Sequence, residues 1–161
     1  MKRLWAPWRM EYIGGGQRPG CLFCRVLEDP DDEDAALAVW RPEGALVMMN
    51  KFPYNPGHTL VAPVAHVPGL ENLDDGQTTL LMRALRRTVD VLRDTMNPEG
   101  FNIGANIGRA AGAGIPDHVH FHVVPRWNGD TNFMAVIDDV KVVNEALEKT
   151  AAKLREAFAR S

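Results

Sequence analysis

Three of the five histidines in the chain fall at alternate positions of one short segment. They are His118, His120 and His122, and the residues between and after them are Val119, Phe121 and Val123. A period of two is that of a β-strand, whose successive side chains point to opposite faces of the sheet. The segment therefore predicts a strand with imidazoles on one face and apolar side chains on the other. We expect Pro125 to end it, because proline cannot donate to a β-ladder.

This row of imidazoles has three explanations. The histidines are solvated on an outer face, or two or three of them bind a metal ion, or they act as a nucleophile and as acid/base catalysts. Histidine is an uncommon residue that titrates near neutral pH, which favours a chemical role over a merely solvated row. The rest of the chain has to distinguish metal binding from catalysis.

Length and composition narrow the classes of protein. The 161 residues suit one domain with one core, and 45% hydrophobic and 24% charged residues are a normal globular mixture. A net charge of −3 argues against a long nucleic acid as partner. No apolar run is long enough to cross a bilayer, and the basic N-terminus lacks the apolar stretch of a signal peptide. We therefore expect a cytoplasmic protein without membrane contact.

Hydrophobic patterns predict the elements around the histidine segment. Further strands are expected at Ala35–Trp40, Ala45–Asn50, His58–Pro63 and Phe101–Ile107. A long helix is expected at Asp74–Met96, with Asp74 and Gln77 as a capping box, and Val143 to Phe158 mark a C-terminal amphipathic helix. Strands and helices that do not alternate regularly predict an α+β domain with an antiparallel sheet of about five strands.

We expect a single domain over residues 1–161. It would consist of an N-terminal arm (1–20), a core (21–126) and a C-terminal loop and helix (127–161). The arm carries Trp5, Trp8 and Tyr12, which either cover the protein's own core or contact a partner, since aromatic residues are enriched at interfaces.

A glycine-rich loop leads directly into the histidine segment. It contains Gly112 and Gly114, and Asn106 precedes it. Glycine lets backbone amides approach a phosphate closely, and successive amides form a concave anion site. The same sequence also fits a plain turn. Beside three imidazoles, a phosphate-binding loop becomes the favoured interpretation.

These segments together resemble the histidine triad (HIT) family. His118 to Val124 resembles its His-x-His-x-His signature, Asn50 to Val61 its upstream ribose-and-histidine segment, and Asn106 to Gly112 its phosphate loop. The resemblance covers residues 21–126 in order. The arm, the approach to the triad and the loop 127–133 resemble bacterial members that act as diadenosine tetraphosphate phosphorylases.

The resemblance implies roles for three histidines. His120 would attack the α-phosphorus of a nucleotide and form a covalent nucleotidyl-histidine, which divides one difficult step into two. His122 would hold the phosphate and assist the leaving group. His58 would orient the site. A nucleophilic His120 must be neutral, with its other nitrogen donating to a fixed acceptor.

The resemblance also implies the substrate contacts. Asn50 would bind the ribose hydroxyls, and Asn106 with amides near Gly112 and Gly114 would stabilise charge on the phosphoryl oxygens. The family usually carries Gln four residues before the first triad histidine, where this chain has Gly114. A side-chain phosphate contact is then missing or comes from elsewhere. The smaller residue leaves room for an incoming oxyanion, which narrowly favours inorganic phosphate over water as the acceptor.

Cys21, Cys24, His66 and His118 form a second constellation. Two thiolates and two imidazoles make a complete tetrahedral ligand set of the kind found in structural zinc sites. Some bacterial members of the resembled family use such a set, and the positions match. His118 would then bind zinc while His120 and His122 carry the chemistry. The alternative is a pair of reduced cysteines packed in the core.

We therefore expect a nucleotide hydrolase or transferase that cleaves dinucleoside polyphosphates, such as diadenosine tetraphosphate, at the α-phosphate. A purine nucleoside phosphoramidase would use the same site, and a nucleotide-binding interaction module or a hydrolase with the triad as metal ligands stays open. The resemblance implies a homodimer or a larger homo-oligomer, for which the long helix and the aromatic arm offer apolar surface.

Overall fold

The computed structural model describes residues 19–130 and 146–160. The strands are β1 (Ala38–Trp40), β2 (Ala45–Met49), β3 (Thr59–Pro63), β4 (Gly100–Gly104) and β5 (Phe121–Arg126), and the helices are α2 (Leu22–Glu28), α3 (Asp75–Met96) and α5 (Leu147–Ala159). Short 3₁₀ turns lie at Ala35–Leu37 (η1), Leu70–Asn72 (η2) and Arg109–Ala111 (η3). No helix among the described residues is long and apolar enough to span a membrane.

The strands form one five-stranded sheet in the order β1-β2-β3-β5-β4, and every neighbouring pair is antiparallel. The register places Met48 opposite Leu60 and Leu60 opposite His122, so these three side chains share one face. The predicted α+β class and antiparallel sheet are confirmed.

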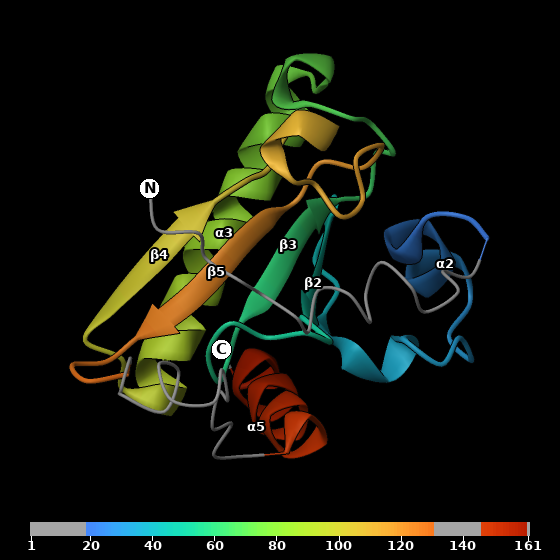
Figure 1. Cartoon of the computed structure of the whole chain (residues 1–161). Coiled ribbons are helices and arrows are strands. Elements are labelled where there is room, and N and C mark those ends of the chain that lie inside the picture. The colour runs from blue at the N-terminus through green and yellow to red at the C-terminus, as the bar shows by residue number, and fades with distance from the viewer. Residues whose placement is uncertain (1–18, 131–145, 161) are drawn as a thin grey trace.

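Helix α3 runs along one face of the sheet, behind the strands in Figure 1. The predicted capping box is present: Asp74 accepts from the Gln77 amide, and the Gln77 side chain accepts from the Asp74 amide. Leu81, Leu85 and Leu92 are buried, as their helical spacing predicts. Helix α5 packs against β1 and α3 and adds Leu154 and Phe158 to the same core. The opposite face of the sheet is left for the site.

The histidine strand is shorter than predicted at one end and longer at the other. β5 begins at Phe121, so His118 and His120 lie in the segment before it. Pro125 lies inside β5 and does not end it. β3 pairs with β5 only as far as Val123, and the Asn55 side chain bonds to the Pro125 carbonyl beyond that point. A proline without a ladder donor is tolerated where no strand pairs on that side.

Three further boundaries differ from the prediction. Residues 35–37 form η1, so β1 is only three residues long, and β4 ends at Gly104. Helix α2 was not predicted, because seven residues beside an acidic stretch give no clear helical period. Its Cys21 cap makes no side-chain hydrogen bond, and the helix is held by Phe23 and Val26, both fully buried. The aromatic residues of the arm and the start of the C-terminal pattern at Val143 lie outside the described residues.

Candidate active site

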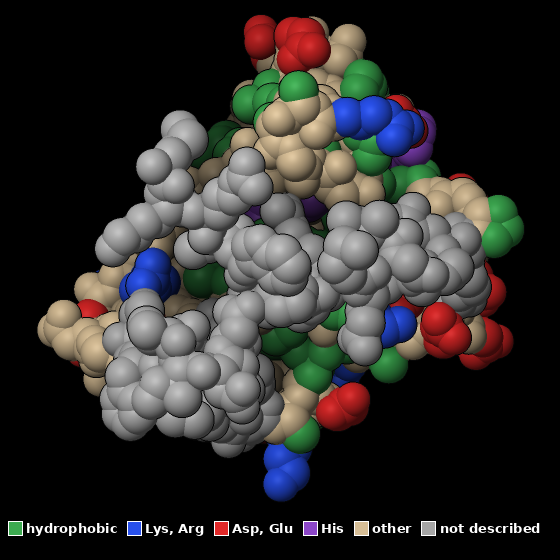
Figure 2. All heavy atoms as spheres, in the orientation of Figure 1, with side chains coloured by type: hydrophobic (Ala, Val, Ile, Leu, Met, Phe, Trp, Pro, Cys, Tyr) green, Lys and Arg blue, Asp and Glu red, His purple; other side chains and the backbone are tan. Residues whose placement is uncertain are grey.

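A cavity of about 840 Å³ opens on the face of the sheet away from α3. Its volume is in the range of small-molecule sites. Its lining includes His120, His122, Asn50, Asn106, Gly112 and Gly114. Figure 2 shows small areas of histidine side chain, in purple, near the middle of this side and a larger one at its upper right edge, with basic and acidic side chains scattered around its periphery. The structure thus brings together every predicted substrate-binding residue and two of the three predicted catalytic histidines.

His120 presents one defined nitrogen to the cavity. Its Nδ1 lies 2.9 Å from the backbone carbonyl oxygen of His118, which only accepts, so Nδ1 carries the proton and donates. In the neutral ring, Nε2 is then the atom with the lone pair. His120 is 4% exposed, and burial lowers the pKa of its imidazole. A neutral ring with an unprotonated Nε2 is the state that a nucleophilic histidine requires.

His58 lies next to His122 and sets the tautomer of the His122 ring, which is the opposite of the tautomer of His120. The backbone N–H of Tyr54 donates to His58 Nδ1 at 3.0 Å, so the His58 proton sits on Nε2. That Nε2 lies 3.0 Å from His122 Nδ1, which therefore accepts. A neutral His122 then carries its proton on Nε2. His58 is fully buried and belongs to the support of the site, not to the cavity lining.

Aromatic contacts hold the imidazole rings in place. Phe23 of α2 packs against His118 and His120, with ring centroids 5.0 Å apart in both pairs. Tyr54 packs against His58 at 4.7 Å and against His122 at 6.0 Å. The first three of these pairs are tilted and Tyr54–His122 is stacked, and both arrangements are favourable beyond the area they bury. Neither aromatic residue was predicted from the sequence, although Phe23 stands between the two cysteines and Tyr54 lies four residues before His58.

The two glycines of the loop have different backbone surroundings. The Gly112 amide donates to the Arg109 carbonyl and closes η3, with Gly112 in the left-handed region at φ 82°. Gly112 therefore shapes the turn, as only glycine does without strain. The Gly114 amide has no hydrogen-bond partner among the residues the structure describes, so it is the better placed of the two to donate to an anion. The side chain of Asn50 is fixed by the Phe52 amide, which donates to its Oδ1 at 2.9 Å.

Three basic residues also line the cavity, and two of them are engaged by carboxylates. Arg25 contacts Asp32 and Asp34, and Lys51 contacts Asp34 at 3.2 Å. Arg109, on η3, forms no ion pair within the described part of the chain. It is thus the lining cation that is available to an anionic ligand.

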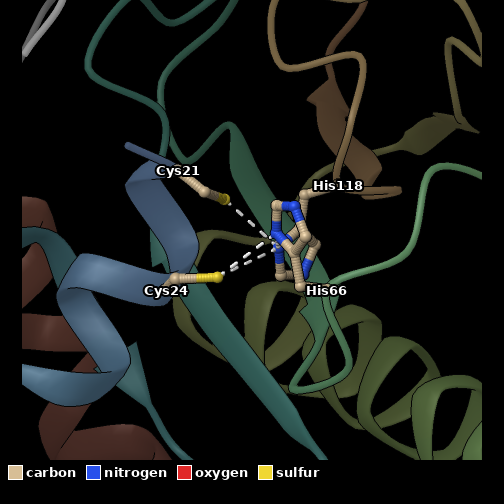
Figure 3. Close-up of side chains that lie close together, drawn as sticks. All are labelled: Cys21, Cys24, His66 and His118. Carbon is tan, nitrogen blue, oxygen red and sulfur yellow. Dashed lines mark hydrogen bonds between the residues drawn. The ribbon is translucent and has the colours of Figure 1, made fainter. Parts of the chain in front are cut away.

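Cys21, Cys24, His66 and His118 converge beside the cavity (Figure 3). The two sulfurs come from the start of α2, and the imidazoles come from the segments after β3 and before β5. Their ligand atoms all lie within 4.8 Å of one another. Cys21 Sγ is 3.2 Å and Cys24 Sγ 3.8 Å from His118 Nδ1, and the two Nδ1 atoms are 3.2 Å apart.

This geometry fits a metal ion. Bond lengths of about 2.3 Å to sulfur and 2.0–2.1 Å to nitrogen place tetrahedral donors about 3.3–3.8 Å apart. His118 Nε2 donates to the Pro63 carbonyl at 2.8 Å, which leaves the Nδ1 lone pair pointing into the cluster. Burial, with a contribution from Cys21, raises the pKa of the Cys24 thiol to about 11. A bound cation would reverse that effect, because it stabilises the thiolate. The four residues can hold a metal.

The two groups of residues meet at His118. Its Nδ1 faces the cysteines, and its backbone carbonyl holds the proton of His120. Its ring is fully buried, and burial lowers the pKa of its imidazole. The cluster and the cavity are therefore neighbours that use different atoms of one residue.

Comparison with known proteins gives one consistent result. The sequence profile of the HIT domain matches residues 32–129. The AP-4-A phosphorylase of Mycobacterium tuberculosis is 36% identical over 169 aligned positions, covering 99% of this chain and 86% of that protein. The asymmetrical bis(5'-nucleosyl)-tetraphosphatase of Schizosaccharomyces pombe is 30% identical and covers 74% of this chain and 62% of its own length.

A solved structure agrees with these relatives. The crystal structure of a zinc-bound histidine triad family protein from Mycobacterium smegmatis aligns with a TM-score of 0.69 at 27% identity, covering 88% of this chain and 94% of that one. The profile match, the near full-length relative and the shared fold confirm the resemblance seen in the sequence. This chain belongs to the histidine triad (HIT) family.

Proposed function

We propose that the protein is a nucleotidyl hydrolase or transferase that cleaves dinucleoside polyphosphates of the diadenosine tetraphosphate type at the α-phosphate. One observation carries the proposal: the hydrogen bonds give His120 an unprotonated Nε2 and give His122 a protonated one. A nucleophile and a donor thus stand side by side, with ring centroids 5.1 Å apart. The relatives named AP-4-A phosphorylase and tetraphosphatase support this substrate class.

In the first step the lone pair on His120 Nε2 attacks the α-phosphorus. The bond from phosphorus to the bridging oxygen breaks, and that oxygen leaves with the electron pair as part of ATP. The His120 ring gains positive charge, which the His118 carbonyl stabilises by accepting from Nδ1–H at 2.9 Å. His122 Nε2–H donates to a phosphoryl oxygen. Asn50, Asn106 and the Gly114 amide bind the nucleotide in the same cavity.

In the second step an acceptor oxygen attacks the adenylylated histidine, and the phosphorus–nitrogen bond breaks with its electrons returning to Nε2. Inorganic phosphate as the acceptor gives ADP, and water gives AMP. We favour phosphate, because Gly114 lines the cavity where the family usually has Gln and leaves space and an amide donor there. The Mycobacterium tuberculosis relative is named a phosphorylase, which supports the same choice.

Rapid quenching with labelled diadenosine tetraphosphate tests both steps. We expect a protein-bound nucleotide that is stable to base and labile to acid, as a phosphoramidate is, and ADP plus ATP as products at millimolar phosphate. AMP as the only small product under these conditions would overturn the phosphorolysis step and leave the nucleophile standing. Turnover without any trapped adduct in the wild-type protein, together with an active His120→Ala variant, would overturn the nucleophile.

We also propose that the metal held by the four-residue cluster is zinc, in a structural role. Two thiolates and two imidazoles are a closed ligand set with no position left for substrate. The zinc-bound Mycobacterium smegmatis structure supports this identity. Both cysteines are free thiols, which suits the reducing conditions of a cytoplasm. Elemental analysis should find about one zinc per chain.

The protein is proposed to act as a homodimer. Strand β4 forms one edge of the sheet, and its Ile103 is 45% exposed. Exposed edge strands with apolar side chains are surfaces that proteins commonly cover. Light scattering at micromolar concentration tests this, and a monomer would contradict it.

A further inference from the structure

A chain of hydrogen bonds joins the end of β5 to the loop that carries His58. The Arg126 guanidinium binds both oxygens of the Asp130 carboxylate, Nε to Oδ2 at 2.5 Å and Nη2 to Oδ1 at 2.8 Å. Asp130 Oδ2 in turn accepts from Asn55 Nδ2 at 2.7 Å. Asn55 Nδ2 also donates to the Pro125 carbonyl at 2.9 Å. Both hydrogens of the Asn55 amide are therefore used, one on the Pro125 carbonyl of β5 and one on Asp130, four residues beyond the end of that strand.

Asn55 and Asp130 are largely shielded from solvent, Arg126 is partly exposed, and all three lie apart from the cavity. Asn55 is 5% exposed, and the side chain of Asp130 is 12% exposed. The Arg126 guanidinium holds the pKa of the Asp130 carboxyl well below its usual range, so the carboxylate stays an acceptor. None of these residues lines the cavity, so they do not contact a bound nucleotide directly. Any effect on the chemistry has to pass through other residues.

Asn55 connects the chain to His58 through the backbone. The His58 amide donates to the Asn55 carbonyl at 3.1 Å, and the Asn50 amide donates to the His58 carbonyl at 2.9 Å. Gly57 lies between Asn55 and His58 in the chain and has a φ of 75°. A Cβ at this position would lie 2.5 Å from the Met96 sulfur. Loop 50–58 thus packs against Met96 at the end of α3 on one side and is hydrogen-bonded to β5 on the other. The same loop supplies the Tyr54 amide that sets the tautomer of His58.

We propose that Asp130 is a positioning residue for the reaction. Through Asn55 it holds loop 50–58 in register with β5, so that His58 Nε2 meets His122 Nδ1 at 3.0 Å. Arg126 and His122 belong to the same strand, so one rigid element carries both ends of the connection. The inference rests on the roles proposed above for His58 and His122.

Loss of the carboxylate leaves Asn55 held by the Pro125 carbonyl alone and lets the loop shift. The Tyr54 amide then no longer fixes His58, and His122 gains the tautomer with its proton on Nδ1, which cannot donate to the phosphoryl group. Misplacement of about 1 Å at a reacting group costs up to about 100-fold in rate. We expect Asp130→Ala to lower kcat about 10- to 100-fold with a smaller change in KM.

A double-mutant cycle separates positioning from simple loss of stability. The variants are Asp130→Ala, His58→Ala and the double variant, assayed with diadenosine tetraphosphate and phosphate at a temperature where all three are folded. If Asp130 acts through His58, the double variant is no slower than His58→Ala alone, within about twofold. Asn55→Ala should repeat the behaviour of Asp130→Ala, and Asp130→Asn, which keeps one oxygen acceptor, should recover part of the rate.

A second readout is independent of turnover. Long-range ¹H–¹⁵N spectra of the imidazoles report which nitrogen carries the proton. We expect His122 to be protonated on Nε2 in the wild type and to become a mixture of tautomers in Asp130→Ala. Asn102→Ala is the matched control, since Asn102 Oδ1 binds Arg126 Nη1 at 2.6 Å without touching Asp130 or Asn55. That variant should keep the wild-type tautomer and turnover within about twofold.

The outcomes are distinct. Rate losses that multiply in the double variant, or a His122 ring that keeps its tautomer in Asp130→Ala, overturn the positioning inference alone. A His58→Ala variant with wild-type turnover overturns the proposed role of His58 and the inference with it. If Asp130→Ala does not fold, Asn55→Ala and Asp130→Asn carry the same cycle.

Discussion

The metal-ligand cluster and the catalytic cavity each use two imidazoles, yet they expose opposite nitrogens. His118 offers Nδ1 to the cysteines because its Nε2–H donates a hydrogen bond to the Pro63 carbonyl. His120, two residues on, keeps its proton on Nδ1 and offers Nε2 to the cavity, because Nδ1–H donates a hydrogen bond to the His118 carbonyl. One backbone acceptor at each histidine decides which nitrogen remains reactive.

The cluster and the cavity also differ in how much space surrounds their imidazoles. In the cluster four donor atoms lie within 4.8 Å of one another, and a tetrahedral metal bound by all four would have no position left for a substrate. The cavity has room for a nucleotide, about 840 Å³, and its wall carries Arg109, which forms no ion pair with any residue that the structure describes. A closed donor set suits stability and an open one suits chemistry. If so, changes in the cluster should affect mainly stability, and changes in the cavity mainly turnover.

The largest effect is expected for His120→Ala. We expect turnover to fall by at least about 10⁴-fold, because no neighbouring group can replace the attacking nitrogen. Zinc content should stay close to wild type, since His120 is not a ligand. Steady-state assays with product analysis and metal analysis of the same sample check both halves. Loss of zinc in this variant would break the separation of the two regions.

Disruption of the cluster should act mainly on stability. Cys24→Ser, or removal of the metal by a strong chelator, should lower the free energy of unfolding by about 3 kcal/mol or more. Denaturant unfolding with and without added zinc measures this. The matched control is a serine substitution at a buried position outside the cluster, such as Ala151→Ser. Metal-free protein of unchanged stability would refute the structural role, and a fully folded metal-free protein without turnover would point to a catalytic metal.

Phe23 contacts both the cluster and the cavity, because its ring packs on His118 and on His120. Phe23→Ala should cost about 3–5 kcal/mol of stability, as buried aromatic residues do. It should also lower kcat, since the ring packs on both His118 and His120. Phe158→Ala, a buried aromatic residue of α5 far along the chain, is the control that should lose stability without a specific loss of kcat. Equal kcat losses in the two variants would contradict a role for Phe23 in ring placement.

The smallest effect concerns pH. Asp130 has a pKa held well below its usual range in the folded state by the Arg126 guanidinium. A depressed pKa adds stability that is present above the unfolded value of about 3.9 and is lost as pH falls toward the folded value. Asp130→Asn should therefore be less stable than wild type by about 1 kcal/mol at pH 7, since Arg126 is partly exposed. The gap should close below about pH 4. A gap that widens in acid would reverse the sign of this linkage.

Much of the fold followed from local patterns. The capping box of α3 and its buried leucines were predicted because helix caps and helical spacing are local properties. β2 and β3 were predicted nearly to the residue for the same reason. The short helix α2 and the true start of β5 were not predicted, because packing of Phe23 and pairing with β3 decide them.

For the site, the sequence by itself determined the residue types, their spacing and the family. The row of histidines, the two cysteines and the glycine loop were all visible in one dimension. Only the tertiary structure decided which nitrogen each imidazole presents, because the deciding partners are backbone groups of Pro63, Tyr54 and His118. It also decided that Asp130 meets Asn55 across 75 residues. Backbone groups carry no signature in a sequence, and their positions are set only when the sheet closes.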